Sequence, residues 1–188
     1  MGKNDYFTYK DYVNFPGDVR YELIDGEAYM MASPSDWHQK MVMDISGQLW
    51  TFFKGKKCQV RIAPFDVRLF PKADESDDVV VQPDIMVICD SLKLSDGKAC
   101  KGAPDFIVEV ISPGTKKKDL GVKKAMYLEA GVREYWVVAE ELVIKHTLVN
   151  GKYAELMYPI LIDAVDIAVD TFDGCIVRFE PEFPETEE

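Results

Sequence analysis

The chain has 188 residues, of which 47% are hydrophobic and 29% charged, and its formal net charge at pH 7 is −11. This balance is typical of a globular protein, and the length fits one domain, which we predict over residues 1–180. The negative charge excludes broad nonspecific attraction to nucleic acid, although one local basic groove stays compatible with it. No apolar run approaches the length of a membrane span, and residues 1–15 lack the apolar core of a signal peptide. We therefore expect a cytoplasmic protein without a membrane partner.

The four cysteines are far apart and never form a CxxC pair, so a structural zinc site is not expected. Buried free thiols are the favoured interpretation of these cysteines, which are Cys58, Cys89, Cys100 and Cys175. Acidic residues are concentrated in the segment 74–78 and in the tail, where residues 181–188 are predicted to be flexible.

The first predicted elements are a hairpin and a helix. Asp25-Gly26 between two strand-like runs predicts a two-residue turn in the segment 21–31. The segment 33–53 has a serine cap, an early proline and helical apolar spacing. That spacing is carried by Met41, Ile45, Leu49 and Phe52, and His38 lies on the same stripe.

The middle of the chain reads as strands followed by a helix. Residues 60–70 alternate as one half-buried strand would, with Pro64 at a bulge or an edge. Two short apolar strands follow within residues 79–90 and 103–112. A helix is predicted from about Asp119 to Ala130, with Gly131 as its C-terminal cap.

The last predicted elements are a strand over 132–138 and a hairpin over 141–158 that turns at Asn150-Gly151. The order of strands and helices is mixed. It predicts an α/β (α+β) fold in which helices flank a mixed β-sheet.

Two of the apolar strands each carry a single carboxylate. Asp84 follows Pro83, and Glu109 lies between Ile107 and Ile111 on one face of its strand, because side chains alternate. Should the strands be neighbours, both carboxylates can converge on a hard cation such as Mg²⁺ or Mn²⁺, with the backbone carbonyl of Val110 as a further ligand. Such an ion can activate water and stabilise charge on a phosphate.

The predicted helix after Glu109 brings lysines near this pair. Its apolar face centres on Leu120 and Tyr127, and Lys123 and Lys124 flank that centre on opposite sides. A lysine at this position can stabilise a transition state or position water. The helical geometry alone does not choose between the two lysines.

At these residues the chain resembles the family of "putative restriction endonucleases" (DUF820 or Uma-type), which belongs to the PD-(D/E)xK nuclease superfamily. The resemblance rests on Gln82-Pro83-Asp84, on GAPDFIVEVISP, on the spacing of Asp119, Lys123 and Tyr127, and on GVREYWVV. It extends to YELIDGE and SPSDWH near the N-terminus.

The resemblance implies a restriction-endonuclease-like fold and an endonuclease that hydrolyses phosphodiester bonds in DNA with Mg²⁺ or Mn²⁺. It implies Asp84 and Glu109 as catalytic and metal-binding acids, Lys123 as the catalytic lysine and Glu22 as an additional acid. One position departs from the superfamily pattern, because Ile111 stands two residues after Glu109 where a lysine is usual.

Other residues are further candidates. His38 is either a site residue or a hydrogen-bonded core histidine, and Tyr127 and Lys124 are additional site candidates. Lys116, Lys117 and Lys118 are either a solvated turn or phosphate contacts.

Three functions stay open from the sequence: an active endonuclease, an inactive nucleic-acid-binding module of the same fold, and a protein-interaction module. Symmetric cutting of a duplex favours a homodimer. The recognition sequence, and the choice between DNA and RNA or between duplex and single strand, are not encoded in any visible motif.

Overall fold

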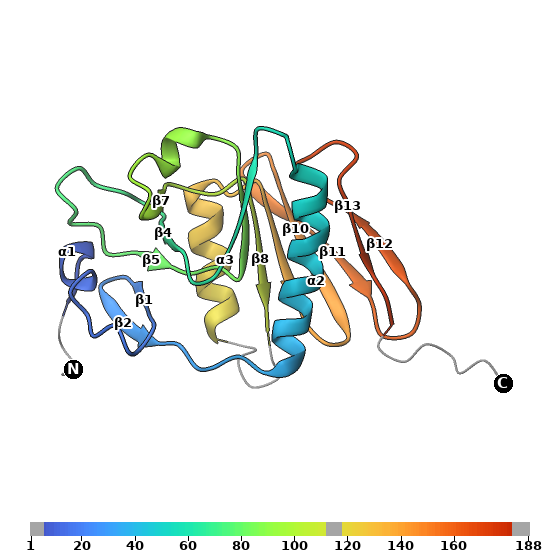
Figure 1. Ribbon diagram of the computed structural model, residues 1–188, viewed down its shortest axis with the longest axis horizontal. Helices are drawn as coiled ribbons and strands as arrows, with labels where there is room; N and C mark the ends of the chain where they lie inside the picture. The colour runs from blue at the N-terminus through green and yellow to red at the C-terminus, as the bar shows by residue number, and fades with distance from the viewer. Residues whose placement is uncertain (1–5, 112–117, 182–188) are drawn as a thin grey trace.

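The computed structural model describes residues 6–111 and 118–181, with only the backbone of residues 118–120 (Figure 1). The helices are α1 (Tyr9–Tyr12), α2 (Asp36–Phe53), the 3-10 helix η1 (Ser91–Leu94) and α3 (Lys118–Ala130). A five-stranded sheet has the order β2 (Glu27–Met30), β1 (Tyr21–Ile24), β5 (Val80–Val81), β4 (Asp66–Arg68) and β7 (Ala99–Lys101).

A six-stranded sheet forms the centre of the fold. Its order is β11 (Lys152–Pro159), β10 (Leu142–Val149), β9 (Glu134–Val138), β8 (Phe106–Val110), β6 (Ile85–Ile88) and β3 (Gln59–Ile62). Neighbouring strands are antiparallel except β8 and β9, which are parallel. A two-stranded sheet of β12 (Val165–Ala168) and β13 (Ile176–Phe179) completes the fold.

The two faces of the central sheet are covered by different layers. Alternate strand residues such as Val108 and Trp136 pack with α2 and with the β12–β13 pair in one apolar cluster. The residues between them, such as Ile107 and Val137, pack with α3 and with the five-stranded sheet in a second cluster. Helices therefore flank a mixed sheet, as the element order predicts (Figure 1).

Several local predictions are confirmed. The hairpin of β1 and β2 turns at Asp25 and Gly26, which both have positive φ angles of 49° and 78°. The hairpin of β10 and β11 turns at Asn150-Gly151 in the same way. Helix α2 begins after Ser35, whose hydroxyl accepts a hydrogen bond from the backbone N–H of His38.

Helix α2 buries the stripe that was predicted for it, with one shift at its end. Met41, Ile45 and Leu49 are buried, and the fourth buried residue is Phe53 rather than Phe52. At the other helix, Gly131 follows the end of α3 with a φ of 82°, in agreement with its predicted role as a cap.

Two predicted single strands are wrong, because each is divided between the two large sheets. Residues 60–70 form β3 in the central sheet and β4 in the five-stranded sheet, and the cis Ala63-Pro64 bond lies between them. Residues 79–90 form β5 in the five-stranded sheet and β6 in the central one, separated by Gln82–Asp84. Proline cannot donate to a ladder, and here each proline marks the place where the chain changes sheets.

The prediction of buried free thiols is wrong for two of the four cysteines. Cys58 and Cys89 form a disulfide, whereas Cys100 and Cys175 are free and buried. The disulfide joins the ends of β3 and β6, where Gln59 pairs with Ile88, so the two cysteines are cross-strand neighbours. The sequence alone does not give this register, and the disulfide depends on it.

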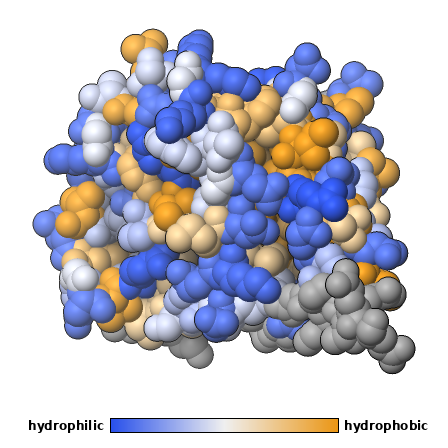
Figure 2. Space-filling model, turned by 45° about the vertical axis from the view of Figure 1, so that its right-hand side comes forward, coloured by the Kyte–Doolittle hydropathy of each residue, from blue (hydrophilic) through white to orange (hydrophobic). Residues whose placement is uncertain are grey.

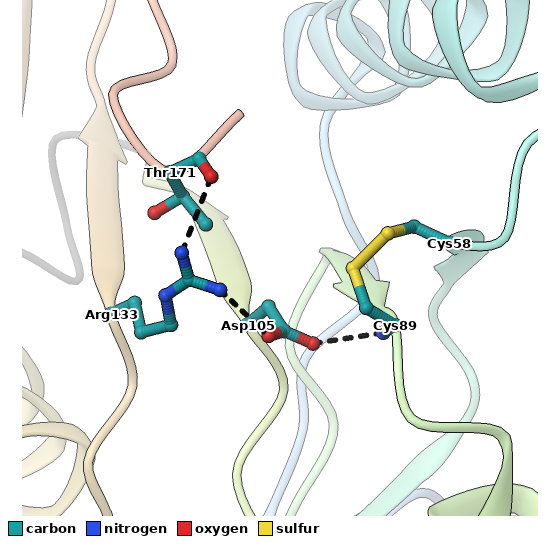
Figure 3. The surroundings of a disulfide bond; sticks show 5 residues. All are labelled: Cys58, Cys89, Asp105, Arg133 and Thr171. Carbon is teal, nitrogen blue, oxygen red and sulfur yellow. Dashed lines mark hydrogen bonds and ion pairs between the residues drawn. A yellow bond between two sulfur atoms is a disulfide. The ribbon is translucent and has the colours of Figure 1, made fainter. Parts of the chain in front are cut away.

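Asp105 supports the strand end beside the disulfide (Figure 3). One of its carboxylate oxygens accepts a hydrogen bond from the backbone N–H of Cys89 at 2.8 Å, and the other accepts one from Arg133 at 3.2 Å. Arg133 also donates to the carbonyl oxygen of Thr171. Although Asp105 follows a proline as Asp84 does, its contacts are structural.

The surface in Figure 2 mixes hydrophilic residues with separate groups of hydrophobic ones. Exposed large hydrophobic side chains include Trp50, Leu156, Ile162 and Ile176. None of the described helices combines the length and apolar composition that crossing a bilayer requires. The homodimer stays a prediction.

The disulfide has a measurable consequence for stability. Replacing both partners with serine (Cys58→Ser/Cys89→Ser) should lower the free energy of unfolding by about 2–4 kcal/mol, because the unfolded chain is then no longer cross-linked. Urea unfolding measures this loss. A reductant should destabilise the wild type and leave the double variant unchanged; equal behaviour of both proteins would contradict the disulfide.

Candidate active site

Asp84 and Glu109 lie beside each other at the end of the central sheet. Strands β6 and β8 are antiparallel neighbours with Ile85 opposite Val108, so the residue before β6 comes next to Glu109. The backbone N–H of Val110 donates a hydrogen bond of 2.8 Å to Asp84 Oδ2. The side chains of the two acids are 13% and 9% exposed respectively, so both carboxylates are largely removed from water.

Lys123 of α3 reaches this edge and bridges two acids. Its Nζ lies 2.8 Å from Glu22 Oε1 and 3.0 Å from Glu109 Oε1. Burial by itself would lower the pKa of Lys123, but the charges of Glu109 and Glu22 outweigh burial and raise this pKa above its usual value. Lys123 is therefore a permanent cation between two buried carboxylates.

Glu22 comes to the site from the other large sheet. It lies in β1, which pairs with β5 at Leu23 and Val80. Its Oε1 also accepts a hydrogen bond of 2.9 Å from the backbone N–H of Gln82, the residue that follows β5. The segment Gln82–Asp84 thus holds Glu22 at one end and supplies Asp84 at the other.

Glu109 carries the most perturbed carboxyl group of the site. Desolvation by burial raises its pKa to about 7, opposed by the charge of Lys123 and reinforced by the charges of Asp84 and Glu22. Tyr127 donates a hydrogen bond of 2.6 Å to Glu109 Oε1, the same oxygen that Lys123 contacts. Among the described residues, Oε2 of Glu109 receives no hydrogen bond and stays available to a ligand.

His38, in the first turn of α2, is a second hydrogen-bond partner of Asp84 besides the backbone N–H of Val110. Its Nε2 lies 3.1 Å from Asp84 Oδ2, and this hydrogen bond raises the pKa of His38, because Asp84 stabilises the protonated ring. Its Nδ1 is buried without a hydrogen-bond partner in the described part of the chain. The hydrogen bonds of Asp84 with His38 and with the backbone N–H of Val110 both use Oδ2.

These side chains line one cavity of about 390 Å³. Glu22, His38, Asp84, Glu109, Val110 and Lys123 belong to its wall, together with Arg20 and Tyr135. A second part of the wall is apolar and includes Met30, Val42 and Ile62. The cavity is therefore lined both by charged groups, including three carboxylates, and by apolar side chains.

Two sets of candidate residues are not part of this arrangement. Lys124 points to β11, where its Nζ lies 2.8 Å from Glu155 Oε2, so the structure chooses Lys123 as the lysine that faces the acids. Lys116 and Lys117 lie outside the described residues, and Lys118 is the first residue of α3. Their phosphate contact stays a prediction.

Three residues at or beside the site were not predicted as site residues, namely Gln82, Arg20 and Tyr135. Gln82 fixes Glu22 through its backbone and receives a hydrogen bond of 3.0 Å from Arg20 on its side chain. Tyr135 is completely buried, yet its hydroxyl has no partner within the described chain. The sequence did offer one signal for Tyr135, namely a tyrosine in a strand that is buried on both faces. The hydroxyl of a buried tyrosine needs a hydrogen-bond partner, and such a position is therefore worth checking.

Comparison with known proteins shows which fold and which family the chain has. The fold matches a crystal structure described as "a putative nuclease belonging to DUF820" from Anabaena variabilis, with a TM-score of 0.67 and 15% identity over 86% of this chain and 89% of that chain. The chain therefore shares the fold of that structure.

A family model narrows the class further. Residues 5–169 match the Uma2 family, which is described as "Putative restriction endonuclease". The chain belongs to this family. No curated protein matches the chain.

The two adjacent lysines offer a matched test of the site. Lys123→Met leaves two buried carboxylates without their cation and should lower the free energy of unfolding by about 3–5 kcal/mol at pH 8. Lys124→Met breaks only a pair whose side chains are 38% and 37% exposed, and should cost less than about 1 kcal/mol. Urea unfolding of both variants measures the difference.

The loss in Lys123→Met should depend on pH. Without the cation the pKa of Glu109 rises further above its wild-type value of about 7, so the folded variant holds a proton that the unfolded chain releases near the usual carboxyl pKa. The destabilisation should therefore be full above this raised pKa, shrink as the pH falls from there to about 7, where wild-type Glu109 also takes up a proton, and stay at the smaller value down to pH 5. Equal losses at pH 5 and pH 8 would contradict a buried charge as the cause.

Proposed function

We propose that the chain is a metal-dependent endonuclease that hydrolyses phosphodiester bonds in DNA. The observation that carries the proposal is the convergence of Glu22, Asp84, Glu109 and Lys123, from three separate elements and a connecting segment, on one cavity. Membership of a family described as restriction endonucleases supports the nuclease class. The ion, the DNA substrate and the roles of individual residues are our proposal.

The donor set of the cavity fits a hard divalent cation such as Mg²⁺ or Mn²⁺. No group of three or more His, Cys, Asp or Glu residues in the described ranges is already arranged to hold a metal ion. Mg²⁺, however, needs only one or two carboxylates and keeps several waters. Asp84 and Glu109 are the two carboxylates we assign to it, with the Val110 carbonyl as a further oxygen ligand.

Both assigned acids have an oxygen to offer. Within the described ranges, the hydrogen bonds of Glu109 use Oε1 and those of Asp84 use Oδ2. The second oxygen of each carboxylate is available to an ion, while the first stays fixed by the protein. The chemistry that a bound divalent ion supplies here is stabilisation of charge on the phosphate and activation of water.

The remaining residues orient these acids and supply positive charge. Tyr127 and Lys123 hold Glu109, whereas His38 and the Val110 N–H hold Asp84. Lys123, Arg20 and protonated His38 line the cavity and offset the charge of an entering phosphodiester. These cations offset the three carboxylates of the wall, and a bound divalent ion would add the positive charge that lets a protein with a net charge of −11 receive a polyanion.

Ile111 is the feature that favours the alternative, an inactive binding module of the same fold. It packs against the apolar cluster of the α3 face and brings no charge to the site. Lys123 supplies an ammonium group from α3 at 3.0 Å from Glu109 instead. The proposed enzyme therefore has a complete set of acids and a lysine, and turnover decides between the two functions. Cutting both strands of a duplex would require two such sites, which a homodimer supplies.

The test is cleavage of mixed DNA substrates by purified protein with Mg²⁺ or Mn²⁺. Cleavage should disappear with a chelator. Asp84→Asn and Glu109→Gln each remove a carboxylate assigned to the ion, and Lys123→Ala removes positive charge beside the phosphate, so each should reduce the rate at least 100-fold. Lys124→Ala is the matched control and should cleave like the wild type.

Calorimetry completes the test. Mg²⁺ or Mn²⁺ should bind to the wild type and bind much more weakly to Glu109→Gln. Metal binding without cleavage of any DNA would favour the inactive module. If the wild type neither cleaves DNA nor binds an ion through Glu109, the proposed function is wrong.

A further inference from the structure

Tyr135 has an unusual environment for a buried polar side chain. Its exposed fraction is 0%, and its hydroxyl has no hydrogen-bond partner in residues 6–111 and 118–181. The only other buried side-chain nitrogen or oxygen without a partner in these ranges is Nδ1 of His38. Both residues line the cavity that holds the carboxylates. Unsatisfied buried groups therefore occur only at this cavity in the described chain.

The position of Tyr135 in β9 directs its side chain to the acids. Tyr135 lies opposite Ile107 in the parallel pair of β8 and β9, and Glu109 lies two residues after Ile107 on the same face. The charges of Glu109, Asp84 and Glu22 all act on the Tyr135 hydroxyl, although none of these carboxylates hydrogen-bonds to it. The hydroxyl is therefore close to the carboxylates without being used by them.

The ring of Tyr135 is held rigidly. It stacks on His146 with ring centroids 5.3 Å apart and meets the edge of Tyr127 at 5.0 Å. His146 Nδ1 also lies 3.2 Å from the carbonyl oxygen of Tyr135. Burial and the nearby negative charges raise the pKa of the hydroxyl well above its usual value, so the group is a donor at neutral pH.

A fixed donor without an acceptor costs about 1–3 kcal/mol, because its hydrogen bond to water is lost and not replaced. The nearest acids already have donors: Lys123 and Tyr127 serve Glu109, and His38 serves Asp84. A phosphodiester entering the cavity would bring anionic oxygens that need donors. The geometry thus fits an acceptor that comes from the substrate.

We propose that Tyr135 is a further catalytic residue, whose hydroxyl donates a hydrogen bond to a non-bridging oxygen of the phosphodiester bound in the cavity. This inference rests on the proposed nuclease function and adds a neutral donor to its charged groups. A donor of this kind stabilises charge that develops on the phosphate.

The test compares two tyrosines. Tyr135→Phe keeps the ring and removes only a hydroxyl without a partner in the described protein, so Tm should be unchanged or higher and kcat about 10- to 100-fold lower. Tyr153→Phe is the matched control. Its hydroxyl donates to the Val132 carbonyl at 2.9 Å and it does not line the cavity, so Tm should fall and kcat should stay at the wild-type value.

A binding measurement separates this inference from the proposed function. In the Glu109→Gln background, which blocks turnover, Tyr135→Phe should weaken binding of a short fluorescent DNA oligonucleotide about tenfold, and Tyr153→Phe should not. Wild-type kcat in Tyr135→Phe, while Glu109→Gln is inactive, would overturn the inference and leave the nuclease intact.

Other outcomes are also decisive. If the wild type cleaves nothing, the proposed function fails, and oligonucleotide binding that depends on Tyr135 still supports the phosphate contact. Equal binding with and without the hydroxyl, or no binding at all, overturns the inference. A fall in Tm of Tyr135→Phe as large as that of Tyr153→Phe would also overturn it, because the hydroxyl would then have a structural partner.

Discussion

The contact of one ammonium group with two buried carboxylates holds the site together. Lys123 belongs to α3, Glu109 to the central sheet and Glu22 to the five-stranded sheet. The ammonium group of Lys123 therefore connects three parts of the fold. Two carboxylates and one ammonium still leave a net negative charge, and Asp84 adds to it. Burial, reinforced by this surplus of negative charge, raises the pKa of Glu109, and a further cation beside it would offset the surplus.

A short connecting segment makes this meeting possible. Gln82–Asp84 carries the chain from β5 in one sheet to β6 in the other. The Gln82 N–H holds Glu22, and the Gln82 side chain accepts a hydrogen bond from Arg20 and donates one to the Tyr12 hydroxyl. Asp84 then faces Val110 across the strand pair. The proline between Gln82 and Asp84 lies where the chain leaves one ladder for another, which is a place that tolerates a missing donor.

The sequence predicted the acids better than their surroundings. A single carboxylate in an apolar strand is conspicuous, so Asp84 and Glu109 could be found by composition, and their neighbouring strands are indeed adjacent. Lys123 and Lys124 could not be separated by helical spacing, because both flank the same apolar face. The disulfide and the divided strands depend on sheet register and on long-range pairing, which alternation along the chain does not encode. Tyr135 was missed because a buried tyrosine reads as core until its hydroxyl is checked for a partner.

The site residues are far apart in the sequence, and this separation has a consequence for the synthesis and folding of the chain. Glu22 and Lys123 are 101 positions apart, so their contact closes a long loop and comes at a cost in chain entropy. A chain still on the ribosome, synthesised from the N-terminus, carries Glu22 and Asp84 well before it carries Lys123. An unfinished chain therefore lacks a complete site, and cleavage by the proposed enzyme would begin only after most of the domain has been synthesised and folded.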